Sequence, residues 1–325
     1  MRLLGAGLSG LLALSAVGTG PAWALAPAQE TVATEQTQAS RLTPRNTPVA
    51  PRLVWSENFE NGTTSAPTSL NYGGVVYRGA QGNTYTGTPV WIDPNKCNGI
   101  IVNSQAPSAA YYGCGSLAMD NLRQVAYGLG QFSATTPTAT NHVLSELSQG
   151  ILGTGIMFQG TGLNTSYPVN GRFLYATVDA GAIQCASADD PIYQFEYTQD
   201  GGTTWSTLGP QTNVCAAGQI ISLPALGAAP AKQGAFLTIN PGSTFRYTGT
   251  SLGVRVANRQ GGGNGNDGGI DNVRVFDASP SMYKSFSPTS MITGQRSLLT
   301  FTIVNTNELG AKAGWSFTDT LPVGL

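Results

Sequence analysis

Short stretches in which apolar and polar residues alternate run along most of the chain, and Gly, Asn, Ser and Thr fill the gaps between them. At 192–198 three aromatic side chains share one face, and 252–257 shows the same two-residue period, which is typical of half-buried antiparallel strands. The pattern predicts strands at 74–77, 90–92, 155–159, 172–179, 192–198, 219–223, 235–239, 252–257 and 270–276. Because no long segment shows a sustained 3.6-residue period, we expect an all-β fold, an antiparallel jelly-roll β-sandwich.

The main domain is predicted to span residues 53–277. Trp55, Glu57 and Phe59 share one face of a first strand, and the Asn-Gly pair at 61–62 predicts a turn after it. The stretch 141–149 favours a helix with Asn141 as its N-cap.

The closing strand of this domain is predicted at 268–276, after a glycine-rich turn. Strict alternation places Asp271 on the same face as Val273 and Val275. A buried carboxylate needs a partner, which here is a structural cation, an arginine or backbone N–H groups. The nature of that partner decides whether the strand carries a site or only marks the domain boundary.

The first residues of the chain indicate export. An apolar run after Arg2 ends in Pro-Ala-Trp-Ala at 21–24, so residues 1–24 read as a secretory signal peptide. Residues 25–52 are rich in Ala, Gln, Thr and Pro and are expected to form a disordered linker. No later segment reaches the roughly 18 uninterrupted apolar residues of a spanning helix, so we expect no membrane insertion.

Composition and cysteine content agree with an extracellular protein. Only 10% of the residues are charged and the net charge is -1, so no basic patch for nucleic acid is visible. Four cysteines are an even number, which favours two disulfides in a secreted chain. Of the three pairings, we expect Cys97 with Cys114 and Cys185 with Cys215, because each pair brackets one loop-rich segment; a metal site would want tighter spacing and further ligands.

Residues that could carry catalysis are few. His142 is the only histidine, and no nucleophile-elbow, zinc-protease or phosphate-loop motif is present. The segment 198–205 fits one copy of the Asp-box pattern of sialidases, which we interpret as a structural hairpin in which Asp200 holds the turn and Trp205 packs beneath it. A β-sandwich glycoside hydrolase needs only two suitably spaced carboxylates, so this class stays as the enzymatic alternative.

Aromatic residues in polar loops favour binding instead. Exposed tyrosine and tryptophan rings stack on sugar faces and pack against protein partners. We expect ligand contacts from Trp91, just before Cys97, and from the adjacent pair Tyr111 and Tyr112 beside Cys114.

Both ends of the main domain resemble a known group. The segments Asn-Phe-Glu-Asn-Gly at 58–62 and Gly-Ile-Asp-Asn-Val-Arg-Val at 269–275 are similar to the two ends of jelly-roll modules of the carbohydrate-binding and MAM-like type. In many of those modules, acidic residues of the first and last strands bind a structural Ca²⁺. The resemblance implies Glu60 and Asp271 as oxygen ligands, together with Asp267 or with backbone carbonyls of the loop 261–269. In the alternative, Asp271 caps its turn through backbone N–H groups and Glu60 is solvated.

The tail, residues 278–325, shows a second resemblance. Its opening Lys-Ser-Phe-Ser-Pro at 284–288 and its closing Thr-Asp-Thr-Leu-Pro at 318–322 are similar to the DUF11-like repeat domains of bacterial surface proteins, which are Ig-like sandwiches. Such a sandwich needs about seven strands. The tail holds fewer, so we expect a truncated repeat, with further repeats or a cell-wall anchor beyond the end of this chain.

Together these features predict a secreted or cell-wall-associated bacterial surface protein whose main domain is a non-catalytic binding or adhesion module. The expected partners are an extracellular glycan or a protein on a host or neighbouring cell, and not nucleic acid. A structural stalk or wall component without a ligand is the second alternative, beside the hydrolase.

Overall fold

The computed structural model describes residues 47–134, 138–147, 155–185, 189–260, 267–308 and 310–321, together with the strand Leu12–Leu14. The chain forms two compact units. The larger unit is Arg52–Asp277, and the smaller one combines Met1–Pro51 with Ala278–Leu325. Apart from Leu12–Leu14, the predicted signal peptide lies outside the described residues.

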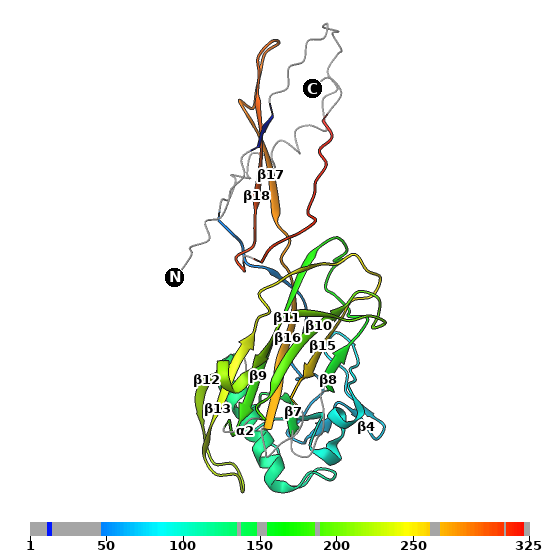
Figure 1. Ribbon diagram of the computed structural model, residues 1–325, viewed down its shortest axis with the longest axis vertical. Coiled ribbons are helices and arrows are strands. Elements are labelled where there is room, and N and C mark those ends of the chain that lie inside the picture. Colours follow the sequence, from blue (N-terminus) through cyan, green and yellow to red (C-terminus); the bar gives the residue numbers. More distant parts are fainter. Residues whose placement is uncertain are drawn as a thin grey trace. The chain divides into compact units, whose positions relative to one another are not determined.

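The larger unit contains two antiparallel β-sheets and a small hairpin (Figure 1). One sheet has four strands in the order β11 (Ser206–Asn213), β10 (Ile192–Thr198), β15 (Gly253–Asn258) and β8 (Gly155–Gly160). The other follows the path β12 (Gln219–Leu223), β13 (Lys232–Ile239), β9 (Phe173–Ile183), β16 (Asp267–Asp277), β7 (Val143–Leu147), β6 (Ile100–Val102) and β3 (Thr68–Ser69); β2 (Arg52–Glu57) joins it at β16 and β14 (Phe245–Arg246) at β9. The hairpin is β4 (Asn71–Tyr72) with β5 (Val75–Val76). The predicted all-β antiparallel sandwich is confirmed.

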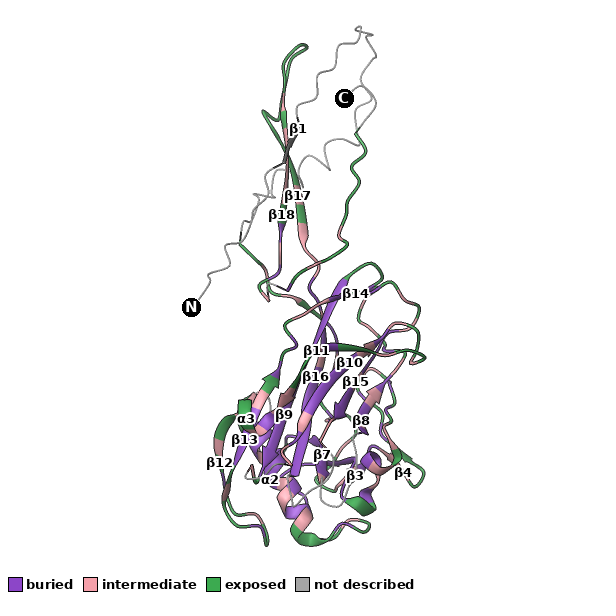
Figure 2. Cartoon of the chain, in the orientation of Figure 1, coloured by how far each residue is buried: buried purple, intermediate pink, exposed green. Residues whose placement is uncertain are grey.

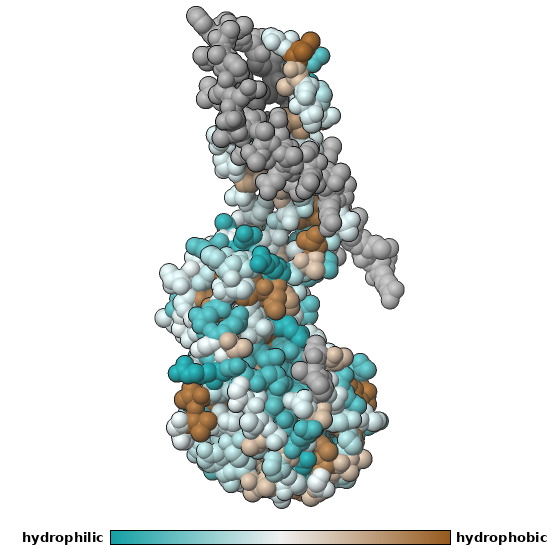
Figure 3. Space-filling view, turned by 180° about the vertical axis from the view of Figure 1, so that it is seen from behind, coloured by the Kyte–Doolittle hydropathy of each residue, from teal (hydrophilic) through white to brown (hydrophobic). Residues whose placement is uncertain are grey.

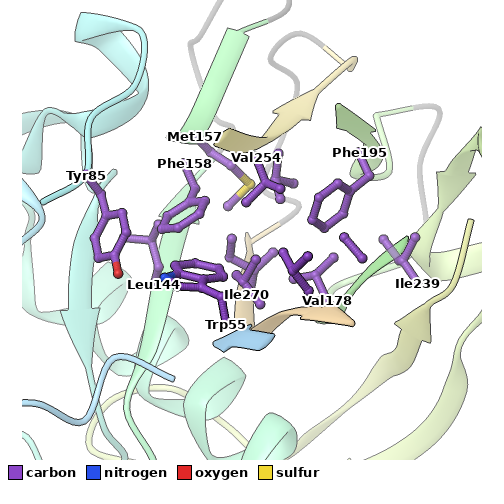
Figure 4. Close-up of a cluster of buried hydrophobic side chains, with 14 of the residues drawn as sticks. Trp55, Tyr85, Leu144, Met157, Phe158, Val178, Phe195, Ile239, Val254 and Ile270 are labelled. Carbon is purple, nitrogen blue, oxygen red and sulfur yellow. The ribbon is translucent and has the colours of Figure 1, made fainter. Parts of the chain in front are cut away.

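The main core lies between these two sheets (Figure 4). Phe158, Phe195 and Val254 point inward from the four-stranded sheet and meet Val178 and Ile270 from the larger one. The alternating patterns at β10 and β15 come from this arrangement, because only one face of each strand enters the core. Strand β9 is buried along its whole length, because both of its faces are covered (Figure 2).

A long helix, α2 (Ser116–Ser133), covers the second face of the larger sheet. Met119, Leu122 and Leu129 of this helix are fully buried in a second apolar cluster with Ile183 of β9 and Phe236 of β13. Their spacing follows the helical period, so the expectation that no sustained 3.6-residue period exists is wrong.

Two further local predictions are also wrong. In place of the helix expected at 141–149, residues 143–147 form a strand, β7, which pairs with β6 and β16 in the larger sheet; residues 148 and 149 lie outside the described residues. The strand expected at 90–92 is a 3-10 turn, η1 (Pro89–Ile92), whose Pro89 lies in its first turn. The remaining short elements are η2 (Pro94–Lys96) and a single helical turn, α3 (Val214–Ala217).

Strand β16 contains a bulge that reverses its predicted facing. Its register against β9 shifts between Asp271 and Arg274, and Asn272 has a positive φ of 49°. As a result Ile270, Val273 and Val275 all enter the core between the sheets, and Asp271 does not share their face. Asp271 instead pairs with Asp179 of β9 on the side that faces away from this core.

Two disulfides fasten loops of the larger unit. Cys97 is bonded to Cys114 with Cα atoms 4.9 Å apart, and Cys185 is bonded to Cys215 with Cα atoms 5.3 Å apart. Both predicted pairings are confirmed.

The smaller unit contains a three-stranded antiparallel sheet in the order β1 (Leu12–Leu14), β18 (Leu298–Val304) and β17 (Ser281–Ser287). Apolar side chains of the hairpin β17–β18, among them Met282 and Ile303, stay substantially exposed. Strand β1 lies within the predicted signal peptide. Cleavage of that peptide would leave β18 without its pairing partner β1.

Candidate functional site

Three tyrosines gather on the surface of the larger unit; we call them the tyrosine cluster. The rings of Tyr111 and Tyr112 meet edge to face with centroids 4.8 Å apart, and Tyr112 meets Tyr72 in the same way at 5.5 Å. Tyr112 is 47% exposed, and the other two are half-buried. Aromatic faces and hydroxyl groups are therefore open to solvent together.

The tyrosine cluster is held by a polar and covalent frame. The Asn95 side-chain amide donates a hydrogen bond to the Tyr72 hydroxyl (2.5 Å), and its oxygen accepts one from the Gly113 N–H (3.1 Å). Tyr111 exchanges two backbone hydrogen bonds with Cys114, whose disulfide anchors the loop. Tyr112 has a positive φ of 51°, which is an unfavourable backbone conformation for a tyrosine. Such a conformation persists only where the surrounding structure holds it, so the loop fixes the backbone of Tyr112.

Trp91, the third predicted ligand residue, does not lie on the surface. It is 1% exposed and packs against Gly155, where an added Cβ would lie 2.0 Å from the indole ring. The expectation that Trp91 contacts a ligand from the surface is therefore wrong. Tyr72 is the third member of the tyrosine cluster. It is one of the other aromatic residues in polar, Gly-rich loops, a position that favours binding but that did not rank it above Trp91.

A polar seam connects the segment that follows β2, the two residues that precede β7, and β16. Glu60 accepts hydrogen bonds from the His142 backbone N–H (2.7 Å) and from its ring Nδ1 (2.6 Å). Asn141, which precedes His142 in the sequence, donates a side-chain hydrogen bond to the Asp271 carboxylate (3.0 Å). The same carboxylate accepts a hydrogen bond from the Asn272 backbone N–H (2.6 Å). We call Glu60, Asn141, His142 and Asp271 the seam cluster.

Burial strongly perturbs the seam cluster. Burial raises the pKa of Asp271 well above its ordinary value; hydrogen bonds from Asn141 and Asn272 oppose the shift, and the nearby charges of Asp179 and Glu60 add to it. Burial alone would lower the pKa of His142, but its hydrogen bonds to Glu60 and to the Thr64 carbonyl outweigh burial and raise it. The seam cluster thus contains an imidazole that Glu60 favours in its charged form.

The oxygen-rich donor set of the seam cluster is of the type that Ca²⁺ prefers. In the described part of the chain, however, no three His, Cys, Asp or Glu side chains are grouped to hold a metal ion. Each carboxylate oxygen of Glu60 and Asp271 already accepts a hydrogen bond from the protein. Glu60 is bound to His142 rather than freely solvated. A Ca²⁺ ion here would need backbone carbonyls as further ligands.

Asp267 does not join the seam cluster. It lies four residues before Asp271 at the start of β16, about 13 Å away along an extended strand, opposite Leu147 of β7. The groups that influence its carboxyl are Lys232 and Asn121. Its predicted role beside Asp271 is therefore wrong.

The Asp-box segment forms the hairpin between β10 and β11. Asp200 accepts hydrogen bonds from the Thr198 hydroxyl (2.6 Å) and from the Thr204 hydroxyl (2.6 Å) and backbone N–H (3.0 Å). The Trp205 indole donates to the Gly202 carbonyl, and Arg255 stacks on its ring at 4.3 Å. The Asp200 carboxylate and the Trp205 indole N–H are thus used within the hairpin itself.

A shallow cavity of about 410 Å³ lies elsewhere in the same unit. It is lined by Gly162, Leu163, Thr165, Pro168, Val169, Asn170, Tyr247, Gly249, Thr250, Ser251 and Leu252. None of these residues is an acid or a histidine, so the cavity offers no pair of carboxylates. The ring of His142 contacts Glu60, the Thr64 carbonyl and the Asn103 amide. None of these described partners is a serine, which a Ser-His hydrolase would need as its nucleophile.

Comparison with known proteins adds the following. Residues 280–325 match the family model "Domain of unknown function (DUF7933)". The DUF11 likeness of the tail stays a prediction. A search of the curated proteins finds no matching sequence.

Among solved structures, the chain is similar to two domains of Lys-gingipain from Porphyromonas gingivalis W83. The K1 cleaved adhesin domain is 10% identical with a TM-score of 0.32, covering 68% of this chain and 96% of that one. The K3 cleaved adhesin domain is 11% identical with a TM-score of 0.32, covering 70% and 99%. The CBM22-1 xylan-binding domain of Xyn10C from Paenibacillus barcinonensis is 10% identical with a TM-score of 0.28, covering 71% and 97%.

Proposed function

We propose that the larger unit is a non-catalytic binding module of an extracellular protein and that it recognises carbohydrate through the tyrosine cluster. The observation that carries the proposal is the grouping of Tyr72, Tyr111 and Tyr112 on a surface loop that a disulfide and Asn95 hold in place. Pyranose rings stack on such aromatic faces, and a rigid frame reduces the entropy lost on binding.

Extracellular location is supported by the two disulfides, because such bonds persist mainly in oxidising compartments. No helix in the described residues combines the length and the apolar character needed to cross a bilayer. The face of the molecule in Figure 3 is mostly hydrophilic where it is coloured, with apolar residues only in small separate patches.

Binding is favoured over hydrolysis by the state of the acidic groups. The Glu60 and Asp271 carboxylates are engaged by donors of the chain, and the cavity of the larger unit has no acid in its lining. A glycosidase needs one carboxylic acid and one carboxylate facing a substrate cleft.

The test is a panel of soluble polysaccharides and oligosaccharides presented to the full chain, with binding measured by affinity electrophoresis and calorimetry. We expect a glycan that binds the unmodified chain and loses about five- to thirtyfold in affinity in Tyr112→Ala and in Tyr72→Ala, since each stacked ring contributes about 1–2 kcal/mol. Tyr127→Ala, on helix α2, is the matched control and should bind normally.

Absence of binding to the whole panel would favour the structural stalk component over the binding module. Equal affinity in the Tyr112→Ala variant and the control would move the site away from the tyrosine cluster.

We also propose that the seam cluster takes up a structural Ca²⁺, with Glu60 and Asp271 as ligands. Support comes from the resemblance of the two chain segments and from the burial of Asp271 close to two other carboxylates, Asp179 and Glu60. A divalent cation would neutralise this negative charge and link the first and last strands.

A further inference from the structure

A second group of reactive side chains lies between helix α2 and the larger sheet, apart from both sites described above. It consists of Asn121 of α2, Lys232 at the start of β13 and Asp267 at the start of β16. Three elements far apart in the sequence thus each contribute one polar side chain.

The amine and the amide of this group are in contact. The Lys232 Nζ lies 2.8 Å from the Asn121 side-chain oxygen. Because the amide carbon is one C=O bond of about 1.2 Å from that oxygen, the amine lies within about 4 Å of the carbon. Reacting atoms in a near-attack arrangement are about 3–3.5 Å apart, so a small rotation of either side chain brings them together.

Asp267 supplies an acid beside this pair. It is 0% exposed, and it lies close enough to Asn121 for that amide to act on its carboxyl as a hydrogen-bond donor, although neither carboxyl oxygen has a fully formed hydrogen bond among the described residues. Burial raises the pKa of Asp267 to about 7, although the Lys232 charge and the Asn121 amide oppose the shift. Burial also lowers the pKa of Lys232. Both shifts increase the share of molecules in which the amine is neutral and the carboxyl is protonated.

We propose that Lys232 and Asn121 become joined by an intramolecular isopeptide bond, with Asp267 as the proton carrier. A simple Lys–Asn hydrogen bond at a helix surface would not need a buried carboxyl that both residues act on. The combination of an amine, an amide and a protonated acid is what amide exchange requires.

The reaction balances without any co-reactant. The neutral Lys232 Nζ attacks the Asn121 side-chain carbon, and a new C–N bond forms. The Asn121 carbon–nitrogen bond breaks, and its nitrogen leaves as ammonia. Asp267 donates its proton to the leaving nitrogen and receives one from Nζ, so the carboxyl ends in the state in which it began.

The experiment is mass spectrometry of the full chain. We expect the intact mass to be lower than that of the same chain with both disulfides formed by about 17 Da, the mass of the ammonia released. After reduction and trypsin digestion, we expect the peptide that contains Lys232 to stay joined to the peptide that contains Asn121, with no cleavage after Lys232.

Variants separate this bond from other losses of ammonia, such as ring closure at Asn-Gly pairs. Lys232→Arg and Asp267→Asn should each have the full unmodified mass and yield no joined peptide. Lys96→Arg, which changes an exposed lysine, should keep the joined peptide.

Far-ultraviolet circular dichroism checks that each variant is folded. An unmodified intact mass for the folded wild-type chain, with normal trypsin cleavage after Lys232, would overturn the proposal. The glycan panel is independent of this result, since the tyrosine cluster shares no residue with Lys232, Asn121 or Asp267.

Discussion

Glu146 of β7 is a carboxyl with no access to solvent. Its Oε1 accepts hydrogen bonds from the Tyr193 hydroxyl (2.6 Å) and the Asn258 amide (2.9 Å), while its Oε2 has no partner among the described residues. Burial raises the pKa of Glu146 to about 7; the hydrogen bonds from Tyr193 and Asn258 oppose the shift. The folded protein therefore holds a proton on Glu146 at pH values where the unfolded chain has lost it.

This difference makes stability depend on pH. Between the unfolded pKa of 4.5 and the folded pKa of about 7, the folded state binds more protons, so the free energy of unfolding falls as pH rises. We expect Glu146→Gln to remove on the order of 3 kcal/mol of this fall, because glutamine cannot ionise.

Urea denaturation of both proteins at about pH 5 and about pH 8 measures this effect through the change in unfolding free energy. The unmodified protein should lose more stability than Glu146→Gln on going to the higher pH. Parallel losses in the two proteins would contradict the assignment of a proton to Glu146.

Single residues also mark where sequence reasoning reaches its limit. The disulfide pairings could be predicted because each closes a local loop. The partners of Asp271 could not, since Asn141 is distant in sequence and becomes a neighbour only when β7 and β16 pair. The facing of Asp271 was predicted wrongly, because a bulge at Asn272 leaves no mark in the apolar pattern.

Among the elements, helix α2 packs on the larger sheet around one aromatic ring, for which glycines leave the room. Phe236 of β13 is 0% exposed and lies among three glycines: Gly128 of α2, Gly181 of β9 and Gly234 of β13. A Cβ added at Gly128 would lie 2.0 Å from the ring, and one added at Gly181 would lie 2.5 Å from it. A side chain at Gly128 or Gly181 would therefore overlap the ring.

Gly128→Ala should therefore destabilise the protein, although alanine is the better helix former. We expect a loss of about 1–3 kcal/mol from overpacking, which exceeds the gain in helix propensity of up to about 1 kcal/mol. Urea denaturation gives the difference.

The double variant Gly128→Ala with Phe236→Leu provides the control. Replacing the ring should cost less in the alanine background than in the unmodified protein, because the two changes are coupled through one contact. Additive losses would show that the helix and the ring do not compete for the same space.

Strands and helix differed in how well the sequence predicted them. The strands β8, β10 and β15 border the main core on one face only, so alternation identified them. Helix α2 was missed because polar and glycine positions, such as Gln124 and Gly128, interrupt its apolar stripe. These residues are buried for specific reasons: Gln124 donates to two backbone carbonyls, and Gly128 leaves room for Phe236.

At the scale of the whole larger unit, the seam cluster connects residues near the start of the unit with residues near its end. If Ca²⁺ binds there, the ion stabilises only the folded state, where Glu60 and Asp271 are close together. At a free Ca²⁺ concentration about 100 times Kd, we expect EDTA to lower Tm by about 5–10 °C.

Calorimetry of the full chain with Ca²⁺ or with EDTA measures this change. Asp271→Asn should melt at the same temperature in both solutions, because it lacks one of the two ligands. Identical melting of the unmodified chain with and without EDTA would contradict the Ca²⁺ proposal. Hydrogen bonds alone would then connect Glu60 with Asp271 through Asn141 and His142.

The pairing of β2 with β16 places Arg52 opposite Asp277, the first and last residues of the larger unit. Antiparallel partners have Cα atoms about 5 Å apart, which is the spacing across the base of an ordinary hairpin. The unit can therefore be spliced as a cassette into a surface turn of an unrelated host protein, with neither host strand having to move. Its entry and exit points would occupy the gap that the host turn already bridges.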